Sequence, residues 1–437
     1  MKCKRIAAAL ATVILCSCTN IENRPAETEN TDSVEAIITF DSDYDEIDFV
    51  TDVEETESEE EIVSDNVSEP ITVTEAAEPE FPEPDREEFT KRLNKIYSDY
   101  GITGMSVALF RNKEIIHTEN IGYSDAETKA LCDDETHYRI ASTSKLISTM
   151  VLMTLYDNGK IGLDSNLTDI TGTQYDRYNK EKIKLWHLLT HTSGIIDTYI
   201  YELAISYKYG IDYILSSAHN GYEPGVIYNY SNFGAGSIGA IVEKLTGEFF
   251  HDYADRAFFE PLGMDAGYVI DLIDDKESCV TLYDYDGEIF HVPTWKRNRE
   301  YYESFGMGNS YMAAQCELII TATDLARLGI VLAGDGTLGG KIVLSQDAVK
   351  AMNTPYFSAP NFDMGLNVRI YDDLIEGRTI YGHPGNALGA ITGLFYDISD
   401  GTGVAFLTNR CSMAVDEKGF YKAIKETLVA AYECYFR

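Results

Sequence analysis

Three short clusters of polar residues have types and spacings that suit acyl transfer. The first is Tyr138-Arg-Ile-Ala-Ser142-Thr-Ser-Lys145, which leads into an apolar, helix-forming run. In a helix the side chains of Ser142 and Lys145 lie one turn apart on the same face. A serine hydroxyl needs an adjacent base to act as a nucleophile, and a lysine shielded from water can be that base. By itself the pair is a weak signal, because serine is also a common helix N-cap.

The second cluster is Tyr230-Ser-Asn232, which follows Glu223-Pro-Gly-Val-Ile-Tyr-Asn. Residues two apart in an extended loop point the same way, so Tyr230 and Asn232 can reach one site. A phenol held beside a lysine can pass a proton to a leaving group. An Asn amide can hold both the lysine and a substrate amide. The alternative is a tyrosine packed on the core ahead of an Asn/Gly turn.

The third cluster is His383-Pro384-Gly385-Asn386, which precedes a predicted hairpin. A cation on an edge strand, followed by a glycine that lets another backbone approach, suits strand-like docking of a substrate amide. We predict that the backbone amides of Ser142 and Asn386 form an oxyanion hole. Taken alone, His-Pro-Gly is also a common turn.

The elements that must position these clusters predict an α+β fold. Residues 87–100 have helical spacing, whereas 104–121 and 390–408 are each predicted to form two strands around a polar turn. A mostly helical middle is predicted over 142–264, and a last amphipathic helix over 417–434. Strands at both ends around a helical insert predict one antiparallel sheet, flanked by the terminal helices, beside an all-helical subdomain.

The first 85 residues differ in composition from the rest. Residues 1–18 combine a basic start with an apolar run too short to span a bilayer, which is typical of a signal peptide. This segment ends in Leu15-Cys-Ser-Cys18, which resembles a bacterial lipobox with Cys18 as the lipidated residue. Residues 19–85 hold 24 acidic residues and one basic residue, which predicts a disordered acidic stalk. The folded domain is predicted over 86–437.

Charge and cysteine spacing exclude several function classes. The net charge of −37 argues against binding nucleic acid or anionic lipid, so the expected membrane contact is the lipid anchor alone. The cysteines after residue 18 include no Cys-x-x-Cys pair and suggest no disulfide framework. His187 and His191 have the spacing of zinc ligands, but no Glu follows His187, and we predict no metal. The Gly-x-Ser-x-Gly elbow of α/β-hydrolases is absent.

The order Ser-x-x-Lys, Tyr-x-Asn, His-x-Gly resembles the serine β-lactamase and penicillin-binding-protein superfamily. Tyr-x-Asn in the second place is similar to the class C β-lactamases, the small DD-peptidases and their esterase relatives. The resemblance covers roughly residues 87–435 and extends to Leu185–Gly194, Tyr230–Gly247, Phe259–Met264 and Thr323–Arg327.

This resemblance implies a serine hydrolase without a cofactor that forms an acyl-enzyme on Ser142, and the segment 1–18 makes it an exported, lipid-anchored one. Lys145 with Tyr230 would take the serine proton. Asn232 would hold the lysine and the substrate, while His383 would orient the substrate or the Tyr230 proton network beside the strand of Gly385. We expect a monomer outside the cytoplasm that acts on cell-wall D-Ala-type peptides, amides or esters.

Two alternatives stay open, a class C-like β-lactamase and a slowly deacylating penicillin sensor. Members that handle β-lactams well usually have Lys-Thr-Gly in the third place. Here Pro384 brings neither a hydroxyl for the β-lactam carboxylate nor an N–H for the strand.

Overall fold

The computed structural model describes residues 83–291 and 298–437. The predicted signal segment 1–18, the lipidation site Cys18 and nearly all of the predicted stalk 19–85 lie outside the described residues. No helix in the two described ranges combines the length and the apolar character that a bilayer crossing requires.

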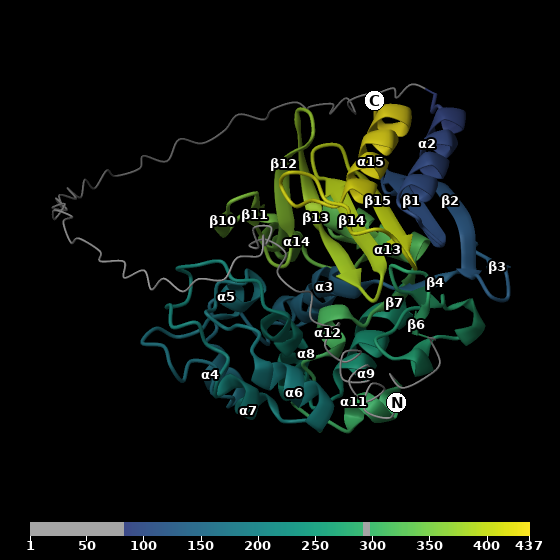
Figure 1. Cartoon of the computed structure of the whole chain (residues 1–437). Helices are drawn as coiled ribbons and strands as arrows, with labels where there is room; N and C mark the ends of the chain where they lie inside the picture. Colours follow the sequence, from purple (N-terminus) through teal and green to yellow (C-terminus); the bar gives the residue numbers. More distant parts are fainter. Residues whose placement is uncertain (1–82, 292–297) are drawn as a thin grey trace, which may run out of the picture. The chain divides into compact units, whose positions relative to one another are not determined.

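A nine-stranded antiparallel sheet forms the upper part of the domain in Figure 1. From one edge to the other its strands are β10 (Phe357–Ala359), β11 (Phe362–Met364), β12 (Arg369–Ile375), β13 (Arg378–Ala387), β14 (Ala390–Asp397), β15 (Thr402–Thr408), β1 (Gly104–Arg111), β2 (Glu114–Asp125) and β3 (Ala130–Leu131).

The two ends of the chain close this sheet, as the sequence predicted. Strand β1 pairs with β15 in a register that sets Met105 opposite Thr408, and it pairs with β2 on its other side. The β1–β2 turn is made by Asn112 and Lys113, both with positive φ, which is the conformation of a tight hairpin turn. The α+β prediction with an antiparallel sheet is confirmed.

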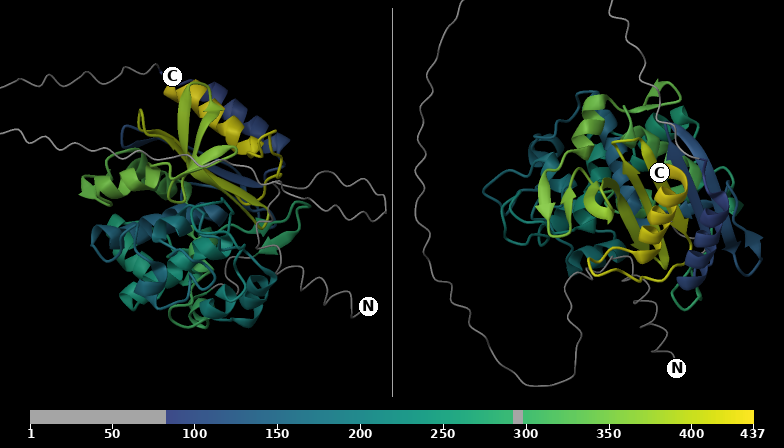
Figure 2. Two further views of the ribbon diagram at one scale, coloured as in Figure 1. Left: turned by 90° about the vertical axis from the view of Figure 1, so that its left-hand side faces the viewer. Right: turned by 90° about the horizontal axis from the view of Figure 1, so that it is seen from above.

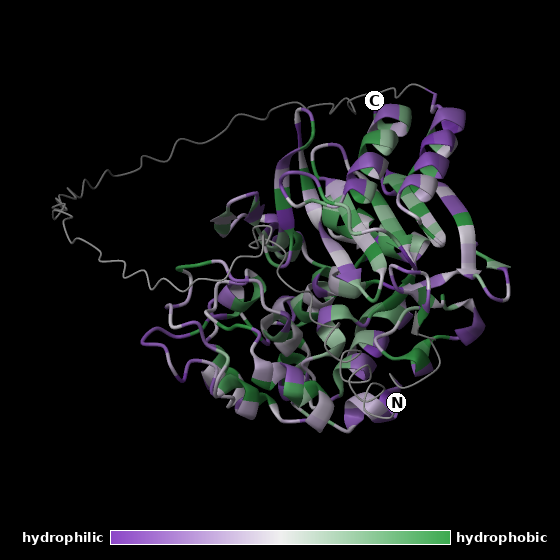
Figure 3. Ribbon diagram, in the orientation of Figure 1, coloured by the Kyte–Doolittle hydropathy of each residue, from purple (hydrophilic) through white to green (hydrophobic). Residues whose placement is uncertain are grey.

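Helices cover both faces of the sheet (Figure 2). Helices α2 (Arg86–Asp99) and α15 (Lys422–Ala431) pack on one face, and α13 (Ala322–Ala333) packs on the other. Successive side chains of a strand point to opposite faces of the sheet. Val404 and Phe406 therefore pack in the core on the side of α2 and α15, while Ala405 and Leu407 pack in the core on the side of α13. This explains why the central strands are almost continuously apolar, whereas α2 and α15 turn polar faces outward (Figure 3).

A helical region occupies the lower part of the domain and carries two of the three clusters. Its helices are α3 (Ser144–Asp157), α4 (Leu167–Thr171), α5 (Leu185–Leu189), α6 (Tyr199–Tyr207), α7 (Ile211–Leu215), α8 (Asn232–Thr246), α9 (Phe250–Ala254), α10 (Glu260–Leu262), α11 (Arg299–Glu303) and α12 (Ala313–Cys316). Short 3-10 or π turns span Ala141–Thr143, Asp255–Phe259, Ile270–Leu272, Lys276–Ser278 and, after α15, Tyr432–Phe436.

Smaller elements complete the domain. They are α14 (Gln346–Asn353) and the strand pairs β4 (His137–Arg139) with β7 (Ile319–Thr321), β5 (Leu282–Tyr283) with β6 (Ile289–His291), and β8 (Thr337–Leu338) with β9 (Lys341–Ile342). Strand β4 leads into the turn that holds Ser142 and β7 follows α12, so the β4–β7 pair ties these two segments to one scaffold.

One predicted boundary is wrong. The last helix was expected from residue 417 but begins at Lys422. The Asp416 carboxylate accepts the N–H groups of Lys418 and Phe420, and Gly419 has a φ of 80°, so these residues form a turn.

Candidate active site

Ser142 lies in the short 3-10 turn that leads into α3, and only 3% of it is exposed. The residue before it, Ala141, has a φ of 50°, a conformation that costs a non-glycine residue roughly 1–3 kcal/mol. Its neighbour Ile140 is fixed on both sides, because its N–H donates to Leu318 and its carbonyl accepts from the Thr392 hydroxyl. The surrounding structure thus holds a strained turn that presents the hydroxyl.

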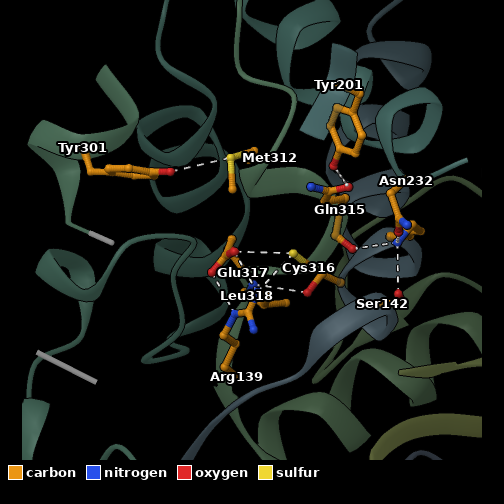
Figure 4. Close-up of polar contacts among 12 residues, drawn as sticks. Arg139, Ser142, Tyr201, Asn232, Tyr301, Met312, Gln315, Cys316, Glu317 and Leu318 are labelled. Carbon is orange, nitrogen blue, oxygen red and sulfur yellow. Dashed lines mark hydrogen bonds and ion pairs between the residues drawn. The ribbon is translucent and has the colours of Figure 1, made fainter. Parts of the chain in front are cut away.

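The Lys145 amine is fully buried and makes three hydrogen bonds. Its Nζ lies 3.0 Å from Ser142 Oγ, 2.9 Å from Asn232 Oδ1 and 3.0 Å from the Gln315 carbonyl oxygen (Figure 4). The last two partners only accept, so a neutral amine donates one hydrogen to each and keeps its lone pair for the Ser142 proton. A protonated amine donates to all three. The same geometry therefore suits both states of a general base.

Asn232 is held in the orientation that this arrangement needs. Its Nδ2 donates to Asp197 Oδ2 at 3.0 Å, which leaves Oδ1 facing Lys145. The Asp197 carboxylate also accepts the backbone N–H groups of Asn232 and Phe233 and the Ser231 hydroxyl, all within 2.9 Å. Because α8 starts at Asn232, this carboxylate also lies at the positive end of a helix.

The Tyr230 ring lies among cations and histidines. Lys145 Nζ is 5.1 Å from the ring centroid and the Arg369 guanidinium carbon is 5.6 Å from it. The ring of His191 is 4.4 Å away and that of His383 is 6.3 Å away. Two positive charges at this range stabilise negative charge that develops on the phenol oxygen during proton transfer.

Both histidines are uncharged. Burial, followed by the charges of Lys145 and Arg369, lowers the pKa of His191 and that of His383 well below the ordinary value. His191 Nδ1 accepts the Ser231 N–H at 3.2 Å, which places its proton on Nε2. His383 Nδ1 lies 2.6 Å from the Pro384 carbonyl and donates to it, so its Nε2 lone pair is left without a partner among the described residues. The cation expected at this edge is therefore Arg369 rather than His383.

The third cluster lies inside strand β13 rather than in a turn. Towards its C-terminal end, β13 pairs with β12 for the last time at Gly382 and Arg369. Beyond that point residues 383–387 pair with β14 on one edge and not with β12 on the other, and this second edge lies beside the site. A Cβ on Gly385 would lie 2.3 Å from Thr392 Oγ1 and 2.5 Å from the Ile140 carbonyl, so only glycine fits against the Ser142 turn. The Asn386 side chain contacts Tyr285, Met413 and Tyr421, away from the catalytic groups. The oxyanion hole formed by its backbone amide and that of Ser142 stays a prediction.

Sequence reasoning missed three residues of this site. Asp197 and Gln315 give no signal of their own, because each acts only through contacts that folding creates. Gln315 is oriented by Tyr201, whose hydroxyl donates to its Oε1 at 2.8 Å (Figure 4). Arg369 did leave a signal, since it is a single cation between the apolar residues Val368 and Ile370.

His187 and His191, whose spacing resembles that of zinc ligands, have other partners in the structure. His187 Nδ1 accepts the Lys184 N–H at the start of α5, while His191 packs on Tyr230 as described. Among the described residues, neither belongs to a group of three potential metal ligands.

A serine hydroxyl bonded to a buried lysine, with a tyrosine over the amine and an open strand edge beside it, defines a serine hydrolase of the Ser-x-x-Lys class. The chain belongs to the beta-lactamase family, whose model matches residues 75–428. It is a member of the serine β-lactamase and DD-peptidase hydrolases, as the three clusters predicted.

The chain is also similar to a curated protein in sequence and to solved structures in fold. Protein Rv1367c of Mycobacterium tuberculosis is 25% identical over 326 residues, which cover 65% of this chain and 79% of that protein. The fold is similar to a beta-lactamase/D-alanine carboxypeptidase from Pseudomonas syringae (TM-score 0.64, 17% identity, 78% of this chain and 98% of that one). It is also similar to a D-amino acid amidase from Ochrobactrum anthropi complexed with D-phenylalanine (TM-score 0.60, 20% identity, 79% and 99%).

Proposed function

We propose that this protein forms an acyl-enzyme on Ser142 and hydrolyses D-Ala-type peptides, amides or esters at the cell wall. The observation that carries the proposal is the Lys145 amine, which lies 3.0 Å from Ser142 Oγ while two carbonyl-type acceptors hold its other hydrogens. This amine can take the serine proton without any change of its partners.

The reaction begins when Lys145 removes the proton from Ser142 as the hydroxyl attacks the substrate carbonyl. Backbone amides of Ser142 and Asn386 stabilise the oxyanion, at about 3–4 kcal/mol for each donor. Tyr230 gives a proton to the leaving group, and the positive charges of Lys145 and Arg369 stabilise the phenolate that results. Water then releases the acyl group, and the substrate backbone lies along residues 383–387.

Arg369 supports a substrate that carries a carboxylate. Its Nε is buried without a hydrogen-bond partner, and no carboxylate forms an ion pair with it among the described residues. Its guanidinium instead lies over the rings of Tyr230 and Phe362. A partly buried cation that lacks a carboxylate partner is poorly compensated, and a substrate carboxylate would supply the missing charge. The carboxypeptidase and amidase named above are consistent with a D-amino acid derivative.

The location is part of the same proposal. The lipobox-like end of residues 1–18 supports export and attachment through Cys18, which would bring the catalytic domain to cell-wall substrates.

Mass spectrometry of the purified protein tests the proposal with three probes, namely a D-Ala-D-Ala peptide, a nitrophenyl ester and a penicillin. We expect a trimmed peptide or rapid ester turnover, with a transient adduct on Ser142 that Ser142→Ala abolishes. Ser144→Ala is the matched control, because Ser144 is buried nearby but accepts the Leu318 N–H instead of contacting Lys145.

Each probe separates one alternative. Rapid penicillin hydrolysis without peptide trimming would favour a class C-like β-lactamase, and a persistent penicillin adduct would favour a sensor. Fluorophosphonate labelling that survives Ser142→Ala would overturn the assignment of the nucleophile.

A further inference from the structure

A second cluster of chemically active groups lies outside the catalytic residues, between α9 and α11. His251 and Asp252 belong to α9, while Arg299 and Glu303 belong to α11. His251 Nε2 lies 3.7 Å from Asp252 Oδ2 and 3.7 Å from Glu303 Oε1. One ligand atom from each of these three residues lies within 4.8 Å of the other two.

His251 Nε2 has no partner within hydrogen-bond distance in this cluster. The residue is 1% exposed, and this nitrogen is buried without a hydrogen bond among the described residues. A buried ring nitrogen in this state forgoes a bond that water would supply, which costs about 1–3 kcal/mol. Asp252 and Glu303 place negative charge beside this nitrogen, and Arg299 contacts both carboxylates.

We propose that His251, Asp252 and Glu303 bind a divalent transition-metal ion, with Zn²⁺ as the best match. Ligand atoms around tetrahedral Zn²⁺ lie about 3.4 Å apart when each bond is about 2.1 Å, so the two distances of 3.7 Å from His251 need a small adjustment, whereas the two carboxylates, within 4.8 Å of each other, must close up further. One imidazole and two carboxylates favour Zn²⁺ over Mg²⁺ or Ca²⁺, which prefer all-oxygen sites. Water would complete the coordination.

In the present structure the Arg299 guanidinium supplies the positive charge beside the two carboxylates. Its Nη1 contacts the Asp252 carboxylate and lies 3.8 Å from Glu303 Oε1. A divalent ion would neutralise both carboxylates, whereas the guanidinium supplies one charge. Because the Arg299 side chain is 36% exposed, it can turn into solvent when the metal enters. Metal binding would then fasten α11 to α9.

Calorimetric titration of the untagged full chain with Zn²⁺, after removal of bound metal with a chelator, tests this site. We expect one tight site, a rise in Tm with Zn²⁺, and a tetrahedral absorption spectrum when Co²⁺ replaces it. His251→Gln and Glu303→Gln should each weaken binding by at least about 100-fold, because each removes a metal ligand. Arg299→Gln should tighten binding roughly fivefold, because it removes the competing cation.

The controls separate this site from other effects. His117→Gln alters a histidine that lies 3.1 Å from Glu119 and belongs to no group of three potential ligands in the part of the chain that the structure describes, so it should leave Zn²⁺ binding unchanged. Ser142→Ala should also bind Zn²⁺ normally, which keeps the inference independent of the proposed function. The site does not exist if the wild type and Arg299→Gln both fail to bind Zn²⁺, or if folded Glu303→Gln binds as tightly as the wild type.

Discussion

Asp197→Asn is the sharpest perturbation of the catalytic arrangement, because it changes one atom of a group that never contacts Ser142. In the wild type two carboxylate oxygens receive four donors. An Asn side chain offers one oxygen and one NH₂ group, so at least one buried donor, such as the Phe233 N–H, loses its acceptor. That loss costs about 1–3 kcal/mol. Removing a negative charge from the start of α8 adds about 0.3–2 kcal/mol.

The free-energy loss of about 1–5 kcal/mol has two readouts. In thermal unfolding the Tm should fall by about 2–7 °C. In ester hydrolysis kcat should fall about 10- to 100-fold, because Asn232 is no longer held with Oδ1 toward Lys145. KM should change much less, since Asp197 is not expected to touch substrate.

The control is Asp212→Asn, which removes a first-turn carboxylate from α7 and leaves Asn232 untouched. It should lower Tm slightly and leave kcat unchanged. A folded Asp197→Asn protein with wild-type kcat would refute the orienting role of Asp197. An equal loss of kcat in Asp212→Asn would refute it as well, because the effect would then be one of stability alone.

Two further predictions concern buried charge. Burial raises the pKa of Glu243 to about 7 from 4.5, although four backbone N–H groups oppose the shift, so folding favours the protonated form. The protonated Glu243 therefore contributes to the free energy of unfolding in full below about pH 4.5. This contribution is lost as the pH rises through 7, a change of about 3 kcal/mol. Urea unfolding at pH 5 and at pH 8 should show most of this decrease in the wild type and not in Glu243→Gln. Arg139 forms a two-bond ion pair with Glu317 in the core (Figure 4). Arg139→Ala should lower the free energy of unfolding by about 3–5 kcal/mol in the same assay, because it leaves the buried Glu317 carboxylate unpaired. The double variant Arg139→Met with Glu317→Leu should recover most of this stability. Equal losses in the two variants would contradict the unpaired carboxylate as the cause.

The sequence predicts those parts of the fold and site that depend on neighbours along the chain. Ser142 and Lys145 are one helical turn apart, and the apolar strands on either side of polar turns are distinct enough to predict a sheet that contains β1 and β15. By contrast, Asp197 acts on residues about 35 positions further on, and Arg369 meets Tyr230 only because β12 begins beside the site. No local pattern encodes contacts of that kind. The sequence also did not predict that the third cluster lies inside β13, because a proline is usually found in a turn.

The acidic composition and the cationic site are compatible because they act over different distances. A net charge of −37, much of it carried by residues 19–85, is screened within about 8 Å at physiological ionic strength. Lys145 and Arg369 lie 5.1 and 5.6 Å from the partly buried Tyr230 ring, where screening is weaker than at the open surface. The local field at the phenol and at an incoming carboxylate is therefore set by these two cations. The acidic surface governs solubility and long-range approach, and the buried pair governs which groups are stabilised once a substrate has entered.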